Sequence, residues 1–303
     1  MKFSVFEYVK TFGPTISIIK AIRHNFFNNY SYFGKELSLF NEKLIKSFLK
    51  KNVPISNNVN STLNKNIKSN SVIWTMWWQG IEDAPSIVKA CISSHKRLNP
   101  QHEVIVITKD NFQHYIKLPQ YILNLLKDKK ISITHFSDIV RVNLLYHYGG
   151  VWADSTLLMT KRIPDYVFKQ DFYTIKTGDY TNDPSHGKWT TFFMEAQKGN
   201  KLMKFLVECF NGYLKNYSIF IDYILLDYFI ALFLEESKTN MNLINQIPLN
   251  NKDVFLLRRF LLKNAGSFDY LNNDTYLYKL SYKDNLKSLE SDGIKTIYKE
   301  LIS

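Results

Sequence analysis

The chain has 303 residues, of which 45% are hydrophobic and 15% aromatic, so it can bury a sizeable core within one large domain. Its two cysteines, Cys91 and Cys209, stand far apart beside apolar neighbours, which excludes a disulfide framework and a cysteine-type zinc site and suits a reducing cytoplasm. The net charge of +12 implies an acidic partner such as nucleic acid, anionic lipid or a phosphorylated substrate.

The first 70 residues form a basic segment with helical patterning. They carry eleven lysines and arginines against three glutamates, a net charge of +8, so two-thirds of the excess charge lies here. Apolar residues recur at helical spacing on both sides of Gly13-Pro14, which predicts two short amphipathic helices, and a third helix is expected from about residue 34 to residue 50. Residues 52–70, rich in Asn, Ser and Lys, have the composition of a linker. We therefore expect a helical N-terminal extension over 1–70 and a main domain over 71–303.

The main domain begins with strands and helices in alternation. Apolar runs at 72–78 and 103–108 alternate with helical patterns at 85–98 and 110–127, which predicts an α/β fold with a mostly parallel sheet flanked by helices. The next helix is expected to begin at Ser137, as its N-cap, and to end at Gly149-Gly150. The later elements are expected as strands at 151–159, 172–177 and 190–195 and as helices at 201–214 and 219–236.

Charged side chains gather on both sides of the double glycine. Asp138 and Arg141 are three residues apart on the first turn of the predicted helix, so both point beyond the carboxyl edge of the sheet, where open α/β sheets bind ligands. Asp154 and Thr156 follow the double glycine, and an aspartate with an oxygen ligand two residues on suits Mg²⁺ or Mn²⁺. The alternative is structural: Asp154 caps a turn, and Thr156 is an ordinary strand residue.

The segment 137–156 has the sequence SDIVRVNLLYHYGGVWADST. It resembles the S-D-x-x-R, L-Y-x-x-G-G and aspartate-containing region shared by capsular polysaccharide synthesis proteins and glycosyltransferase family 32, and it is more distantly similar to the glucosylating domain of large clostridial toxins. Upstream, IWTMWWQG at 73–80 resembles the opening strand of the capsular group. The resemblance is good over 71–210 and implies a GT-A, Rossmann-like fold for the main domain and a sugar transferase that uses a nucleotide-sugar donor.

The same resemblance implies roles in binding the donor. Trp77, at the end of the first strand, would stack on the nucleotide base, with Trp78 as the weaker candidate. Asp138 and Arg141 would contact the ribose and the sugar or phosphates. Asp154 would hold a divalent metal, Mn²⁺ or Mg²⁺.

The match to the stricter DxD motif is incomplete, because Thr156 stands at the second acidic position. This removes one negative charge and leaves metal dependence open. The implied reaction is transfer of a hexose from a UDP-sugar to a hydroxyl of a lipid-linked oligosaccharide in bacterial capsular polysaccharide synthesis. Kinship with family 32 implies retention of configuration.

Three further side chains outside this segment are candidates. His186 follows a polar loop and could be a metal ligand or a donor to a phosphate, or simply be solvated. Asp222 and Asp227 each precede a tyrosine within an apolar stretch, where a carboxylate is costly unless it is paired or used. One of them could act as general base or orient the acceptor, and an inverting enzyme would need such a base. The alternative is that both are structural.

Two lysines near the C-terminus complete the candidate set. The segment YKLSYK at 278–283 resembles a family segment that usually has His before its first Lys and Trp before its second, and both positions are Tyr here. Lys279 and Lys283 could neutralise a diphosphate. The alternative is that they are solvated surface lysines.

The basic N-terminal helices suit contact with an anionic membrane surface, so the protein is expected to be cytoplasmic and peripheral on the inner face of the plasma membrane. The alternative is a helical hairpin that packs on the main domain with its charges solvated. We expect neither a signal peptide nor a membrane span, because the most apolar stretch, 223–234, is short and contains Asp227. Two other functions compete with transfer. A nucleic-acid-binding protein fits the charge, but the basic residues form no known binding motif, so no nucleic-acid partner is expected. A non-catalytic assembly subunit could keep the fold with Thr156 in place of the second acid.

Overall fold

The computed structural model describes residues 5–26, 31–55, 67–178, 182–261, 275–284 and 296–302. Within these ranges the centre of the molecule is a five-stranded sheet with the strand order β2-β1-β3-β6-β5. Its strands are β1 (Val72–Met76), β2 (Glu103–Ile107), β3 (Gly150–Ala153), β5 (Phe172–Thr174) and β6 (Phe193–Ala196). β1 is parallel to β2 and β3, whereas β6 is antiparallel to β3 and β5. The predicted α/β fold with a mostly parallel sheet is confirmed.

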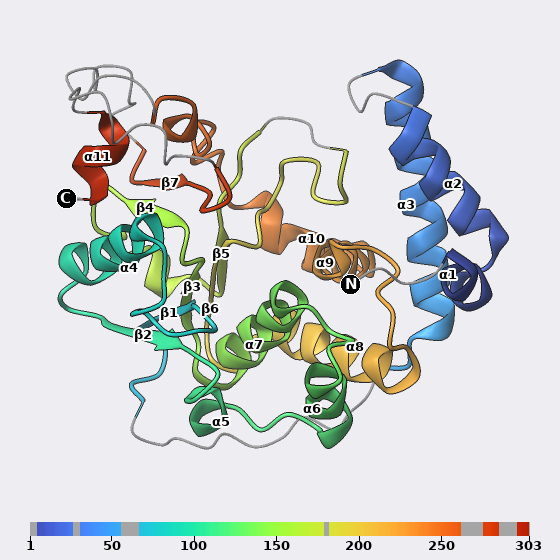
Figure 1. The fold of residues 1–303 in the computed structure, drawn as a ribbon, viewed down its shortest axis with the longest axis horizontal. Helices are drawn as coiled ribbons and strands as arrows, with labels where there is room; N and C mark the ends of the chain where they lie inside the picture. Colours follow the sequence, from blue (N-terminus) through green and yellow to red (C-terminus); the bar gives the residue numbers. More distant parts are fainter. Residues whose placement is uncertain are drawn as a thin grey trace.

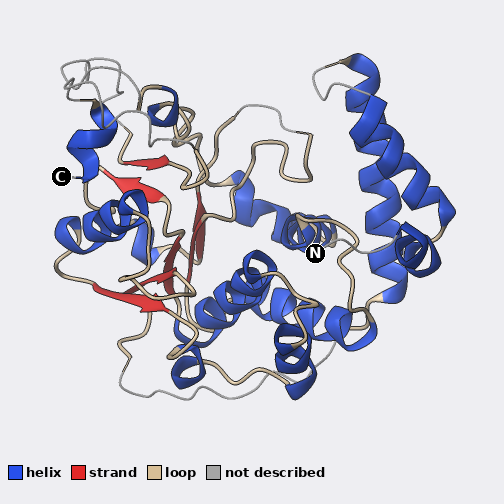
Figure 2. Cartoon of the chain, in the orientation of Figure 1, coloured by secondary structure: helices blue, strands red, loops and turns tan. Residues whose placement is uncertain are grey.

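Helices flank this sheet (Figures 1 and 2). α7 (Ile133–Tyr148) contacts β1, β3 and β6 and is backed by α8 (Lys201–Asn216). α4 (Ser86–Leu98) contacts β2 and a short strand outside the main sheet. The short helices between β2 and α7 are α5 (Phe112–Tyr115) and α6 (Gln120–Lys127). All residues of β1 and β3 are buried, as is usual for strands covered on both faces.

Helix α7 begins one turn earlier than predicted. Its N-cap is Ser132, whose hydroxyl accepts a hydrogen bond from the His135 N–H at 3.1 Å, so Ser137 lies inside the helix and is not its cap. The helix ends at Gly149 as predicted, and the φ angles of Gly149 and Gly150 are 70° and 90°. A Cβ on Gly150 would overlap the carbonyl oxygen of Val72. Glycine is therefore needed here for the turn and for the close approach of β3 to β1.

The predicted strand at 151–159 is two strands in different sheets. β3 ends at Ala153, and β4 (Leu157–Met159) pairs antiparallel with β7 (Leu277–Lys279) in a second, two-stranded sheet of the described chain. A turn separates them, in which the Leu157 N–H donates to the Asp154 carbonyl at 2.9 Å. The β4–β7 pair brings the C-terminal part of the chain to the end of β3.

The predicted helix at 219–236 begins later than expected, as α9 (Leu225–Glu235). Asp222 and Tyr223 therefore lie in the preceding loop and share no helix face with Asp227. The remaining elements are η1 (Val167–Lys169), α10 (Lys238–Asn245), η2 (Leu257–Arg259) and α11 (Ile297–Ile302).

The N-terminal helices α1 (Val5–Phe12), α2 (Pro14–Phe26) and α3 (Tyr32–Asn52) form a layer on the right of Figure 1, beside α9. The prediction of a helical N-terminal segment, broken at Gly13-Pro14, is confirmed. α3 buries Ile45 and Leu49 in the main core, while the division into domains at residue 70 stays a prediction. Of the predicted linker, residues 56–66 lie outside the described ranges. No helix described here is long and apolar enough to cross a membrane.

Candidate active site

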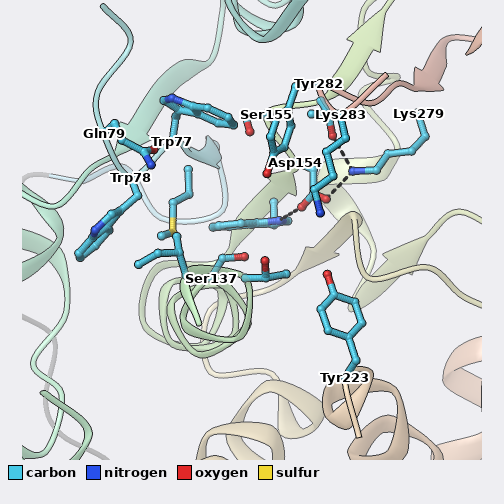
Figure 3. Close-up of a pocket in the computed structure, with 15 residues that line it drawn as sticks. Trp77, Trp78, Gln79, Ser137, Asp154, Ser155, Tyr223, Lys279, Tyr282 and Lys283 are labelled. Carbon is cyan, nitrogen blue, oxygen red and sulfur yellow. Dashed lines mark hydrogen bonds and ion pairs between the residues drawn. The ribbon is translucent and has the colours of Figure 1, made fainter. Parts of the chain in front are cut away.

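The candidate site lies where β1 and β3 end. These strands are parallel and in register at Trp74 and Trp152, so the residues that follow them, Trp77 and Asp154, meet at the carboxyl edge of the sheet. A cavity of about 350 Å³ opens there, within the usual size range of small-molecule sites (Figure 3). Its walls come from the end of β1, the first turns of α7, the turn after β3 and the segment after β7.

Asp154 is the carboxylate in the wall of this cavity. Its Oδ1 accepts hydrogen bonds from Arg141 Nη2 at 3.1 Å and Trp152 Nε1 at 2.8 Å, and its Oδ2 accepts from Lys279 Nζ at 2.6 Å. Burial alone would raise the pKa of Asp154, but the charges of Lys279 and Arg141 and the hydrogen bonds outweigh it, so the pKa is lowered. Asp154 is therefore held as an anion between two cations.

Arg141 lies behind Asp154 and does not line the cavity. Its side chain is 4% exposed, and its guanidinium is 3.1 Å from both Asp138 and Asp154 and 4.9 Å from the centre of the Trp152 ring. Burial raises the pKa of Asp138 to about 7, against the opposing charge of Arg141. Neither Asp138 nor Arg141 lines the cavity: Arg141 bonds to Asp154 from within the protein, and Asp138 pairs with Arg141. The direct donor contacts expected of these two side chains stay a prediction.

Lys279 reaches the site through the β4–β7 pair. Its Nζ donates to Thr156 Oγ1 at 2.7 Å as well as to Asp154, so the two residues expected to bind a metal converge on an ammonium group. Lys283 also lines the cavity. In the described part of the chain, no group of three or more His, Cys, Asp or Glu side chains is placed to hold a metal ion. This arrangement does not fit the expected Mn²⁺ or Mg²⁺, because the cation would have to displace the Lys279 ammonium from Asp154 and Thr156 and lie beside Arg141.

Aromatic side chains form a second part of the cavity wall. The rings of Trp77 and Tyr282 lie edge to face with centroids 5.1 Å apart, and Tyr282 is 46% exposed. Trp78 also lines the cavity but packs against Phe112 and Phe136. Trp77 is therefore the better placed of the two tryptophans to meet a planar ligand.

Sequence reasoning assigned no role to two tyrosines that line the cavity, Tyr223 and Tyr282. Tyr223 is 60% exposed, and its hydroxyl points toward the cavity in Figure 3. Tyr223 belongs to the repeated Asp-Tyr pair, in which only the aspartates were predicted as site residues. The repeat of the tyrosine was the signal that could have identified it. Tyr282 stands where the family usually has tryptophan. An aromatic side chain at that position in both cases was the signal that could have identified it.

Three predicted site residues lie elsewhere. His186 Nε2 is 3.0 Å from Glu42 Oε2 in a separate cavity between α3 and α9, so the structure does not bring it to Asp154, and its role as a metal ligand or phosphate donor stays a prediction. Asp222 forms an ion pair with Lys20 at 3.1 Å, which ties the loop before α9 to α2, and it does not line the cavity. This pairing supports the structural alternative for Asp222.

Asp227 is buried near the site but does not line the cavity. Its Oδ1 accepts a hydrogen bond from Trp189 Nε1 at 2.9 Å. Burial raises its pKa to about 7, and the nearby Asp183 adds to the shift. The contact with Trp189 supports the structural alternative for this residue.

The protein is glycosyltransferase-like: it has an α/β sheet and, at the carboxyl edge of that sheet, an aspartate set among lysines and tryptophans. More particularly, the chain belongs to the capsular polysaccharide synthesis protein family, whose model matches residues 24–301. That match begins within α2, so it includes most of the segment predicted as an extension.

Two relatives share the transferase description. The chain is 24% identical over 158 residues to the O-glycosyltransferase braB of Annulohypoxylon truncatum, a match that covers 48% of this chain and 38% of that protein. It therefore spans well under half the length of this curated relative. Among solved structures it is similar to PaToxG Glycosyltransferase, with a TM-score of 0.38 and 13% identity over 71% of this chain and 83% of that one.

Proposed function

We propose that the protein transfers a sugar, a hexose from a UDP-sugar, to a hydroxyl of a lipid-linked oligosaccharide. One observation carries the proposal: a single cavity at the carboxyl edge of the sheet is lined both by the aromatic pair Trp77 and Tyr282 and by the charged side chains of Lys279, Lys283 and Asp154. A nucleotide sugar needs both kinds of surface, since its base is planar and apolar on its faces and its diphosphate is anionic. The family membership supports the same reaction class.

The proposed step moves one glycosyl group. The bond between sugar C1 and the β-phosphoryl oxygen breaks, and its electron pair passes to that oxygen. The acceptor hydroxyl oxygen forms the new bond to C1, and its proton passes to the departing nucleoside diphosphate. Retention of configuration requires the acceptor to approach on the face that the diphosphate leaves.

Negative charge grows on the departing diphosphate during this step. Lys279 and Lys283 line the same cavity, so they offer positive charge where it is needed. Asp154 holds Lys279 in place from one side, and Arg141 fixes Asp154 from behind. Asp154 and Arg141 are positioning residues in this arrangement.

The proposed acceptor places the protein at a membrane surface. The N-terminal layer exposes large apolar side chains, with Phe6 at 78% and Phe33 at 70%. Exposed lysines accompany them on the same helices, Lys10, Lys35 and Lys43. Exposed aromatic and basic side chains together favour adsorption to anionic lipid.

A donor screen tests the function. The melting temperature is measured with UDP, ADP, GDP and CDP and with a panel of UDP-sugars, each in EDTA and in Mn²⁺, because a bound donor stabilises the folded state. We expect a shift with UDP and with at least one UDP-sugar. If no UDP-sugar shifts the melting temperature, the donor class is wrong.

Turnover separates an enzyme from a non-catalytic subunit. UDP release from the stabilising UDP-sugar is followed with and without membrane extract as acceptor source. Asp154→Ala is expected to abolish release, while Asp128→Asn, at an exposed position after α6, is expected to keep it. Binding of a UDP-sugar without release under any condition would favour the non-catalytic subunit.

A further inference from the structure

The position expected for a metal ion is occupied by a side chain. Asp154 Oδ2 and Thr156 Oγ1, the two oxygen atoms of the incomplete DxD motif, lie 2.6 Å and 2.7 Å from Lys279 Nζ. An ammonium group has three N–H donors in a compact arrangement, so it can satisfy two neighbouring oxygens and keep one N–H for a ligand. Lys279 is 21% exposed and lines the cavity, which leaves its head accessible from that side.

The backbone makes this contact a built feature. Lys279 is the last residue of β7 and is paired with Leu157 of β4, three residues after Asp154. The next residue anchors the strand further, because the Leu280 N–H donates to the Thr156 carbonyl at 2.9 Å. The Lys279 N–H itself donates to the Val254 carbonyl at 2.7 Å. The lysine is thus fixed at both its main chain and its head.

The other carboxylate oxygen is also engaged. Asp154 Oδ1 accepts from Arg141 and Trp152, so donors already approach both oxygens of the carboxylate. A divalent cation here would lie beside the guanidinium and the ammonium, and like charges at such distances repel. Both oxygens of the incomplete motif that the protein would offer it, Asp154 Oδ2 and Thr156 Oγ1, are already bonded to Lys279 Nζ.

We propose that the Lys279 ammonium takes the place of the divalent cation, so that this site binds a nucleoside diphosphate without metal. The inference rests on the proposed function and defines how its diphosphate is held. Lys279 keeps its bonds to Asp154 and Thr156 and donates its remaining N–H to a phosphoryl oxygen. Thr156 then suits the site better than a second acid, because a hydroxyl accepts from the ammonium without adding negative charge beside the diphosphate.

Calorimetric titration with UDP tests the inference. The wild-type affinity is expected to agree within about threefold between EDTA and Mn²⁺. Lys279→Met, which keeps the unbranched aliphatic stem and removes the ammonium group, is expected to weaken UDP binding in EDTA by about 10-fold to 150-fold, the loss of one hydrogen bond to a charged group. Lys279→Arg should retain most of the affinity. Lys89→Ala, at an exposed position on α4, should leave it unchanged.

Manganese binding to the protein alone gives a readout free of nucleotide. Electron paramagnetic resonance measures how much Mn²⁺ the protein binds. We expect wild type and Asp154→Asn to bind Mn²⁺ equally, because Asp154 holds no Mn²⁺ site. Such a site, UDP binding that requires Mn²⁺, or unchanged UDP affinity in Lys279→Met would each overturn the inference while leaving the proposed function standing. If no nucleoside diphosphate binds in either EDTA or Mn²⁺, both fail. Circular dichroism melts confirm that each variant is folded.

Discussion

Arg141 and Asp154 are separated by 13 positions in the chain, yet Nη2 of the arginine lies 3.1 Å from Oδ1 of the aspartate. The arginine comes from the middle of α7 and the aspartate from the turn after β3, so the contact spans the double glycine. Because Arg141 is 4% exposed, it carries its charge inside the protein and depends on Asp138 and Asp154 for compensation.

Removing this buried cation should cost stability. Arg141→Met leaves Asp138 and Asp154 with less compensation, and breaking a buried ion pair in this way costs about 3–5 kcal/mol. Chemical denaturation measures the free energy of unfolding. Asp138→Asn is the matched control and should cost less, because burial already favours the protonated form of Asp138, with a pKa of about 7. A loss under about 1 kcal/mol for Arg141→Met would show that the network contributes little.

The aromatic wall should select for the nucleotide base. Trp77→Leu is expected to weaken UDP by about 1–3 kcal/mol, the usual contribution of one stacked base, while inorganic pyrophosphate, which has no base, binds as before. Trp78→Leu is the matched control, since Trp78 packs against Phe112 and Phe136 and should affect stability more than affinity. Equal losses of UDP affinity in the two variants would contradict the assignment of Trp77.

The double glycine can be tested by steric bulk alone. Gly150→Ala should prevent stable folding, because the added Cβ would overlap the Val72 carbonyl of the neighbouring strand. Gly199→Ala is the control: Gly199 also has a positive φ, 78°, but a Cβ there meets nothing within 4 Å. The free energy of unfolding of that variant should fall by only about 1–2 kcal/mol, the cost of holding alanine in a left-handed conformation. Thermal melting of both variants separates the two effects.

A buried acid should make stability depend on pH. Glu195 lies on β6 and is fully buried, and burial raises its pKa from 4.5 to about 9, with the hydrogen bond from Gln197 opposing the shift. Between these values the folded state holds a proton that the unfolded state releases, so stability falls as pH rises across this window.

Glu195→Gln should remove that dependence. The variant is expected to gain about 1 kcal/mol or more over wild type at pH 8 and little at pH 5, as measured by denaturation at each pH. Glu236→Gln, at an exposed position, should follow the wild-type profile. A slope unchanged by Glu195→Gln would assign the pH dependence to other groups.

The proposed membrane contact predicts a surface effect. The double variant Phe6→Ser and Phe33→Ser should lower binding to phosphatidylglycerol vesicles in sedimentation by about tenfold or more, because each buried aromatic side chain contributes about 1.5–3 kcal/mol. Tyr166→Ser is the control, since Tyr166 is 53% exposed but lies before η1, outside the N-terminal helices. Equal vesicle binding by all three proteins would argue against the N-terminal layer as the contact surface.

Local patterns predicted the parts of the site that depend on where a strand or a helix ends. Trp77 and Asp154 follow two buried strands, and parallel strands place such residues at one edge whatever the details of the fold. The end of α7 at Gly149 was also predicted correctly, because glycine readily adopts the positive φ angle found at the end of many helices. By contrast, the strand expected at 151–159 failed because a continuous apolar run does not reveal a turn that moves the chain into a second sheet.

Long-range contacts were beyond that kind of reasoning. The bond between Lys279 and Asp154 joins positions 125 apart, and no periodicity specifies the β4–β7 pairing that creates it. The same limit applies to His186 and Asp222, whose partners Glu42 and Lys20 come from the N-terminal helices. A charged side chain that could serve a site can instead pair with a residue far away in the sequence. The tertiary structure determines which of the two partners it has.

The β4–β7 pairing has a consequence for how the protein is made. All residues of the main sheet precede position 197, whereas the ammonium group bonded to Asp154 arrives with Leu277–Lys279. Synthesis of the sheet therefore finishes well before the last charged group of the candidate site leaves the ribosome. A chain that ended after α9 would leave Asp154 without one of its two cations.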